Sequence, residues 1–124
     1  MTNTYFEILR PGTNTTIQDS GRNYLYHKGV TVSGAIDQRN YKLANFLVNN
    51  KLHDAIIEFA YQGPLLRLKN GKISFAITGD VIFNIIRKNC EVEKGKCYQN
   101  YILDDEDQID IISTKKFVYG YLSV

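Results

Sequence analysis

A short segment near the start of the chain brings together an amide, a carboxylate and a guanidinium. Gln18, Asp19 and Arg22 occur within five residues of one another, with Gly21 between the last two. Asp19 and Arg22 can form a charge-assisted pair at the end of a strand. The pair can also brace a turn, because Asp accepts backbone amides and a glycine such as Gly21 can adopt φ angles that other residues avoid. Spacing alone favours the structural brace over a catalytic role. In the functional interpretation, Asp19 is a candidate catalytic residue, and Gln18 and Arg22 are candidate substrate-binding residues.

A second polar segment contains Ser33, Gly34 and Asp37. A serine before a glycine raises the hypothesis of a nucleophile, which needs a neighbouring base and an oxyanion hole. Nothing in the sequence places His27 or His53 beside Ser33, so a Ser–His–Asp triad is not favoured. We expect Ser33 to form local hydrogen bonds and Asp37 to cap a helix. The Gly-rich loop can still offer backbone amides to a carboxyl or acyl group, so all three residues are candidate substrate-binding residues.

Two further polar residues are candidates because of their surroundings. Asn45 lies on the polar side of the predicted helix, where its amide is either exposed or orients a polar substrate. Glu58 lies in the apolar strand 56–60, where a buried carboxylate needs a partner. Burial would raise the pKa of Glu58 and suit a general base. The alternatives are a salt bridge to Arg22 or Arg39, or exposure, and we favour a structural pair.

The acidic run 104–107 contains four consecutive carboxylates. A calcium loop places its ligands at alternate positions and includes a glycine turn, and this run does neither. The run therefore predicts a solvated acidic turn between two strands, and the sequence predicts no metal site.

Cys90 and Cys97 flank a predicted turn at Lys94-Gly95. A four-residue loop would place the two cysteines opposite one another, whereas a two-residue loop would not. In a reducing cytoplasm we expect two free thiols.

The elements that position these residues are mostly short strands. We predict strands at 4–9, 15–19, 55–61, 65–69, 73–78, 81–87, 96–102, 108–113 and 117–122. The pair Asn70-Gly71 predicts a hairpin between the fourth and fifth of these strands. A long structured loop is expected from 20 to 36.

One helix is predicted from 38 to 49, with Asp37 as its N-cap. Tyr41, Ala44, Leu47 and Val48 fall on one side, flanked by Leu43, while Gln38, Lys42, Asn45 and Asn49 fall on the opposite side. Many short strands with one helix indicate a mostly β sandwich or an antiparallel barrel, in which closure would remove exposed edges.

Several patterned segments occur in a fixed order along the chain. They are 15–22, 29–37, 43–50, Glu58, Gly63-Pro64, Thr78-Gly79 and Tyr121-Leu122. In this order and spacing the chain resembles the biotin-dependent carboxyltransferase-like family, which includes allophanate hydrolase subunit 2 and the C component of 5-oxoprolinase. The same unit occurs inside urea carboxylase. The resemblance covers essentially the whole chain but only the first half of the usual family length.

The resemblance implies a fold and an activity. The fold is a cyclophilin-like antiparallel β-barrel with one main α-helix, and residues 1–124 would form one such domain. The implied reaction is ATP-dependent opening of 5-oxoproline to glutamate, carried out with a companion subunit resembling allophanate hydrolase subunit 1 and with a third subunit. Carboxyl transfer to urea is the close variant, and the lack of a biotin-acceptor or biotin-carboxylase pattern lowers it. We expect no cofactor to be bound by this chain alone, with ATP used by the assembled complex.

The resemblance also has departures and alternatives. The family usually has Thr-Gly-Ala-Asp where this chain has Thr78-Gly79-Asp80-Val81, and an arginine where it has Tyr119. In the family, the resemblance implies, sites form between the two halves and a companion subunit, so half a site should catalyse poorly.

The alternative function is a non-catalytic binding or regulatory module, or the relic of a split gene, that docks a companion subunit. If the apolar residues of the last strand are exposed, we predict a homodimer through that edge, with Phe117, Val118, Tyr119, Tyr121 and Leu122 as the candidates.

Bulk composition excludes some function classes. The 124 residues fit one domain, and 15 basic against 13 acidic residues leave a net charge of +2. This balance does not favour nucleic acid or an anionic membrane as a partner. Neither a signal peptide nor a membrane span is predicted, so the expected location is the cytoplasm.

Overall fold

The computed structural model describes residues 3–18, 36–52, 54–116 and 118–124. The described elements are one helix and ten strands, in the order β1 (Tyr5–Arg10), β2 (Thr16–Gln18), α1 (Gln38–Leu47), β3 (Ile56–Ala60), β4 (Leu65–Lys69), β5 (Ile73–Thr78), β6 (Val81–Ile86), β7 (Val92–Lys94), β8 (Asn100–Leu103), β9 (Gln108–Thr114) and β10 (Tyr119–Ser123). The predicted mostly β fold with one main helix is confirmed.

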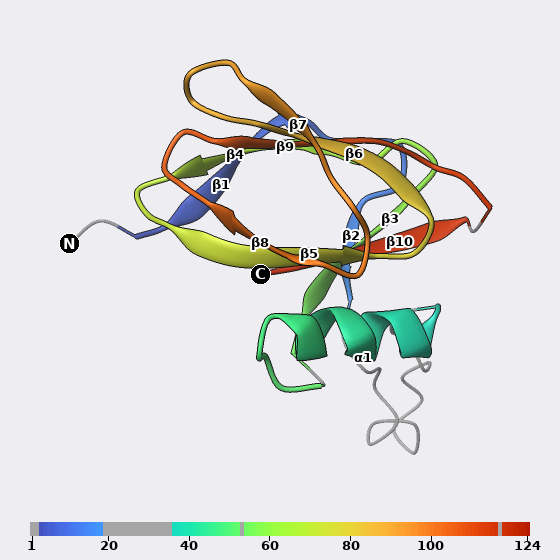
Figure 1. Cartoon of the computed structure of the whole chain (residues 1–124). Coiled ribbons are helices and arrows are strands. Elements are labelled where there is room, and N and C mark those ends of the chain that lie inside the picture. Colours follow the sequence, from blue (N-terminus) through green and yellow to red (C-terminus); the bar gives the residue numbers. More distant parts are fainter. Residues whose placement is uncertain (1–2, 19–35, 53, 117) are drawn as a thin grey trace.

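The strands pair into two antiparallel sheets of five strands each. We call the sheet with strand order β1-β4-β9-β6-β7 sheet A, and the sheet with order β2-β3-β10-β5-β8 sheet B. Figure 1 shows the two sheets facing one another, with α1 on the outer side of sheet B. The described strands form two sheets rather than one continuous hydrogen-bonded barrel.

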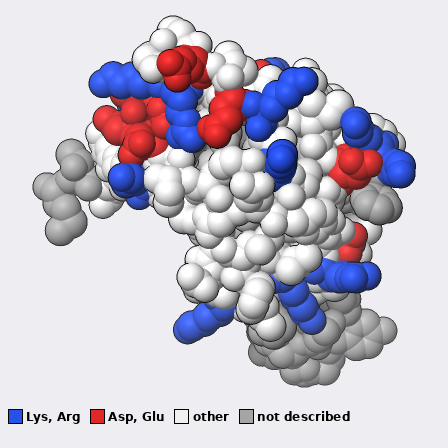
Figure 2. Space-filling view, in the orientation of Figure 1, with Lys and Arg blue, Asp and Glu red and all other residues white. Residues whose placement is uncertain are grey.

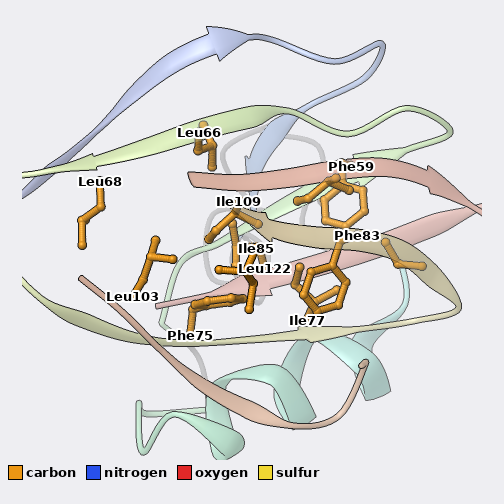
Figure 3. Packing of buried hydrophobic residues seen from close by; sticks show 12 residues of the cluster. Phe59, Leu66, Leu68, Phe75, Ile77, Phe83, Ile85, Leu103, Ile109 and Leu122 are labelled. Carbon is orange, nitrogen blue, oxygen red and sulfur yellow. The ribbon is translucent and has the colours of Figure 1, made fainter. Parts of the chain in front are cut away.

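The space between the sheets holds the main apolar core (Figure 3). Side chains alternate along a strand, so every second residue faces this core. In β6, Phe83 and Ile85 are buried, while Ile82 on the opposite face of the strand is exposed. Phe75 and Phe83 meet edge to face, with ring centroids 6.3 Å apart. The alternation of side chains along each strand therefore sets which face of the strand lies inside.

The central strand β10 of sheet B is buried on both faces because α1 covers the outer side of the sheet. Leu122 of β10 joins the core between the sheets, whereas its neighbour Tyr121 packs against Tyr41 and Ala44 of α1. β10 lies between β3 and β5, so it is a central strand. The expected exposure of the last strand is wrong for Tyr121 and Leu122, which are buried, whereas Val118 is exposed and Phe117 lies outside the described residues. The homodimer stays a prediction.

The hairpin predicted at Asn70-Gly71 is also wrong. Asn70 has the expected positive φ of 64°, but β4 belongs to sheet A and β5 to sheet B. β1 and β9 pair with the two edges of β4, which leaves no edge for β5. The turn therefore carries the chain from one sheet to the other.

A similar change of partner separates the strands around Lys94-Gly95. β7 pairs with β6, and the following strand β8 pairs with β5. Gly95 is needed for close approach, because an added Cβ would lie 1.9 Å from the Phe83 ring. Cys90 and Cys97 are both free, as expected.

The outer surface of the molecule carries charges of both signs. Figure 2 shows Lys and Arg side chains interspersed with Asp and Glu side chains over the upper part of this face. The ion pairs Arg87–Glu93 and Lys69–Glu106 are among those formed at the surface. This mixture agrees with the near balance of charge in the sequence.

Candidate functional site

A polar layer lies between α1 and the outer face of sheet B, and Glu58 is at its centre. Glu58 and Tyr121 occupy directly paired positions of β3 and β10. Glu58 is 5% exposed, and its Oε2 accepts from the Tyr121 hydroxyl at 2.6 Å and from the Ile36 amide at 2.8 Å. These two donors replace the water that a buried carboxylate loses. The expected structural pair exists, but its described partner is a tyrosine rather than Arg39.

The Tyr121 hydroxyl links Glu58 to the start of the helix. The same oxygen accepts from the Asp37 amide at 2.7 Å while it donates to Glu58. Burial and the hydrogen bond to Glu58 raise the pKa of Tyr121 well above its ordinary value. The hydroxyl therefore stays protonated at neutral pH and holds the end of α1 against β3.

Asp37 caps α1, as the sequence predicts. Its Oδ1 accepts from the Asn40 amide at 3.1 Å, and its Oδ2 accepts from the Asn40 side chain at 2.7 Å. The other side-chain atom of Asn40, Oδ1, accepts from the Tyr98 hydroxyl at 2.8 Å, and Thr78 donates to the Asn40 carbonyl at 2.8 Å. A continuous run of hydrogen bonds thus extends from Glu58 through the helix N-cap to Tyr98.

Asn45 is fully buried, which corrects its assignment to the polar side of the helix. Its Nδ2 donates to the Asp54 carbonyl at 2.8 Å, and its Oδ1 accepts from the Ser123 hydroxyl at 2.6 Å. The helical pattern misplaces this side chain because the segment after α1 and the end of β10 cover a second side of the helix. Tyr41 and Ala44 are buried as predicted. Asn45 therefore connects α1 to Asp54 and to the end of β10, and a substrate cannot reach its amide without displacing these partners.

The remaining predicted site residues lie in or beside the segment 19–35. Gln18 ends β2, and its amide donates to the Thr16 hydroxyl at 3.0 Å. The other four, Asp19, Arg22, Ser33 and Gly34, lie outside the described residues, as do most of the predicted loop 20–36 and both histidines. Thr16 pairs opposite Glu58, and the Ile36 amide binds the Glu58 carboxylate. The described residues on both sides of this segment therefore lie next to Glu58, Thr16 through the strand register and Ile36 through the carboxylate.

A pocket of about 550 Å³ opens at the turn between β5 and β6. It is lined by Gly79, Asp80, Val81, Lys96, Cys97, Tyr98 and Lys116. Tyr98 connects the pocket to the polar layer, because its hydroxyl also accepts from the Gly79 amide at 3.2 Å while it donates to Asn40. Gly79 has φ of 106°, and an added Cβ would lie 3.0 Å from the Tyr119 carbonyl. The two departures from the family pattern, Asp80 and Tyr119, thus adjoin the same glycine.

Sequence reasoning missed Tyr98 and Asn40 as members of this layer. Tyr98 falls within the predicted strand 96–102, but it has a positive φ of 62° and precedes β8. Left-handed backbone at a tyrosine is uncommon and is not visible from residue type. Tyr121 belongs to one of the patterned segments, but its pairing with Glu58 follows only from the β3–β10 register.

The acidic run 104–107 is only partly solvated. Asp107 is 3% exposed and accepts from Arg87 Nη1 at 3.0 Å, from the Lys88 amide at 2.8 Å and from the Asp104 amide at 2.9 Å. The predicted exposed turn is wrong at this position, because the carboxylate closes its own turn and ties it to the end of β6. Within the described ranges no three Asp, Glu, His or Cys residues are grouped to hold a metal ion.

Comparison with known proteins identifies the family. Residues 28–124 match the family model described as carboxyltransferase domain, subdomain A and B. The chain therefore belongs to this family. Among the part of the chain that is described, no helix is long and apolar enough to span a bilayer.

Two relatives differ in how much of this chain they match. The chain is 36% identical over 77 residues to urea amidolyase of Lachancea kluyveri, which is 61% of this chain and 4% of that protein. It is 29% identical over 85 residues to the C component of 5-oxoprolinase from Escherichia coli K12, which is 68% of this chain and 24% of that protein. The matched region is thus about a quarter of the second relative.

Solved structures share the fold. A crystal structure of TTHA0988 has a TM-score of 0.85 at 27% identity, covering 96% of this chain and 43% of that chain. The urea amidolyase of K. lactis has a TM-score of 0.85 at 28% identity, covering 95% of this chain and 7% of that chain. The chain spans less than half the length of each.

Proposed function

We propose that this chain is a component of an ATP-dependent amide- or lactam-processing enzyme. In this assembly it takes the place of the C component of 5-oxoprolinase, and companion subunits complete the opening of 5-oxoproline to glutamate. The observation that carries the proposal is the similarity to that component, which extends over 68% of this chain. The match to the carboxyltransferase-domain family supports it.

The polar layer supports a positioning role for Glu58. The carboxylate accepts from the Ile36 amide, and the backbone of Glu58 pairs with Thr16, so Glu58 adjoins the described residues on both sides of the segment with Asp19, Arg22, Ser33 and Gly34. In the proposed enzyme those four residues bind the substrate, and Glu58 with Tyr121 places them. Preorganised groups contribute more to rate than groups that must be ordered during the reaction.

The chain supplies no cofactor of its own in this proposal, and ATP is used by the assembled complex in the cytoplasm. The first companion resembles allophanate hydrolase subunit 1, and the second is a metal-dependent-hydrolase-like subunit. Carboxyl transfer to urea remains the close variant, because urea amidolyases are also relatives.

The test is reconstitution with the companion subunits encoded by the same genome. The chain should co-elute with the subunit resembling allophanate hydrolase subunit 1 in size-exclusion chromatography. With 5-oxoproline and ATP, glutamate and ADP should form only when the chain is present. Equal turnover without the chain would contradict a catalytic role, and urea-dependent turnover in its place would select the carboxyl-transfer variant.

A second candidate is a non-catalytic module that docks a companion subunit. The observation that favours it is that the Glu58 carboxylate is buried and accepts hydrogen bonds from Tyr121 and Ile36 rather than facing a substrate. This candidate predicts co-elution with the companion and no change in turnover. Absence of co-elution would contradict both candidates.

A further inference from the structure

The pocket at the β5–β6 turn carries an excess of positive charge. Lys96 and Lys116 line it and are exposed, and neither forms an ion pair with a described residue. Asp80 is the single carboxylate in its lining. Burial raises the pKa of the Cys97 thiol, so this group is uncharged at neutral pH. The lining therefore has one net positive charge.

The walls of the pocket are held in place before any ligand arrives. The Tyr98 backbone amide donates to the Ile77 carbonyl at 2.8 Å. The Tyr98 hydroxyl donates a hydrogen bond to Asn40 and accepts one from the Gly79 amide. Tyr98 keeps a positive φ of 62° in this arrangement. Residues held in such sparsely populated backbone conformations cluster at ligand sites.

Asp80 fixes the opposite wall. Its carbonyl accepts from the Lys115 amide at 2.8 Å, and its Oδ2 accepts from the Lys116 amide at 3.3 Å. The backbone that carries Lys116 is thereby tied to the turn that carries Asp80. Val81 and the Tyr98 ring supply apolar surface beside the two lysines.

We propose that this pocket binds a small organic monocarboxylate through Lys96 and Lys116. Two ammonium groups attract one carboxylate, and the carboxylate of Asp80 opposes a second negative charge on the ligand. The apolar surface of Val81 and Tyr98 accepts a compact ring or aliphatic body, and the volume is in the range of small-molecule sites. Using 5-oxoproline, a lactam with one carboxylate, as the first probe rests on the proposed function.

The test is an NMR titration of the ¹⁵N-labelled chain at low ionic strength, where exposed charges are least screened. The probes are 5-oxoproline, its uncharged amide, acetate and inorganic phosphate. We expect amide-resonance shifts at Gly79, Asp80, Lys96 and Tyr98 with 5-oxoproline and with acetate. The uncharged amide should bind about tenfold more weakly, because it loses the attraction of two exposed cations.

The matched variants compare lysines within and outside the pocket. The double variant K96Q/K116Q should weaken 5-oxoproline binding about tenfold, the sum of two modest charge interactions. The double variant K94Q/K115Q removes the same charge from neighbouring exposed residues that do not line the pocket, and its Kd should stay within about twofold. Equal losses in the two double variants would overturn the proposal, as would equal binding of the uncharged amide or tighter binding of phosphate.

This titration separates the pocket from the proposed enzyme. Carboxylate binding that depends on Lys96 and Lys116 supports the pocket even if reconstituted turnover fails. Turnover with no binding at these residues would overturn the pocket and leave the proposed function standing.

Discussion

The Tyr121 hydroxyl and the Glu58 carboxylate are joined by a 2.6 Å hydrogen bond between directly paired positions of β10 and β3. Both side chains are buried on the helix side of sheet B. The bond connects a central strand to the N-cap of α1, since the same hydroxyl accepts from the Asp37 amide. Removing one oxygen atom would therefore disturb three elements at once.

Replacing Tyr121 with phenylalanine should destabilise the chain by about 1–3 kcal/mol, because the Asp37 amide and the Oε2 atom of Glu58 lose a buried hydrogen-bond partner. Urea denaturation followed by circular dichroism would measure the change. Tyr61→Phe is the matched control, because Tyr61 is 59% exposed. A loss no larger than that of the control would contradict a structural role for the Tyr121 hydroxyl.

Stability should fall as pH rises into the alkaline range. Burial raises the folded-state pKa of Cys97 above 9.0 and that of Tyr121 above 10.0. The unfolded state releases these protons first, so their contribution is fully present below those ordinary values and is lost as pH rises toward the folded-state values. Denaturation midpoints between about pH 7 and pH 11 would record the loss.

Two variants assign that loss to its sources. Cys97→Ala should reduce the fall that begins near pH 9, and Tyr121→Phe should reduce the fall that begins near pH 10. A rise in stability across this range would show that the sign is wrong.

Asn45→Ala should cost about 2–3 kcal/mol, because it leaves the Asp54 carbonyl and the Ser123 hydroxyl without their buried partner. Arg39→Ala on the exposed side of the same helix serves as the control and should change stability by less than about 0.5 kcal/mol. Thermal unfolding of the two variants would compare them. If Asn45→Ala keeps full stability and instead weakens ligand binding, Asn45 belongs to a substrate site.

Asp107→Ala should cost about 3 kcal/mol, because it removes the buried carboxylate partner of the half-buried Arg87 guanidinium and leaves two backbone amides without their acceptor. Asp104→Ala is the contrasting change within the same run, since its carboxylate is 60% exposed and lies 3.5 Å from Lys72. That exposed pair should contribute less than about 1 kcal/mol. Similar losses at the two positions, measured by urea denaturation, would contradict this distinction.

Local chemistry is enough to predict most of the elements. The Asp37 cap and the strand predicted at 81–87 depend on neighbours in sequence, and both are confirmed, the strand as β6. The left-handed backbone at Asn70 is also predictable, since asparagine tolerates it. Such features are encoded within a few residues.

Strand partners are not predictable in the same way. The residue types at Asn70 predict that the chain changes direction there, but they do not predict which strand pairs with β5. That partner is β10, which lies more than forty residues later in the sequence. The burial of Asn45 likewise depends on Ser123 and Asp54, which the helical period does not contain. Of the candidate site, Asp37 and Glu58 follow from sequence, while their connection through Tyr121 requires the tertiary pairing.

The central position of β10 has a consequence for how the chain folds during synthesis. β3 and β5 both pair with residues 119–123, so sheet B cannot be completed until that strand is available. Until then a nascent chain carries two unpaired strand edges and an α1 that lacks Tyr121 beneath it. Because pairing across such long sequence separation is slow, folding intermediates should expose these edges.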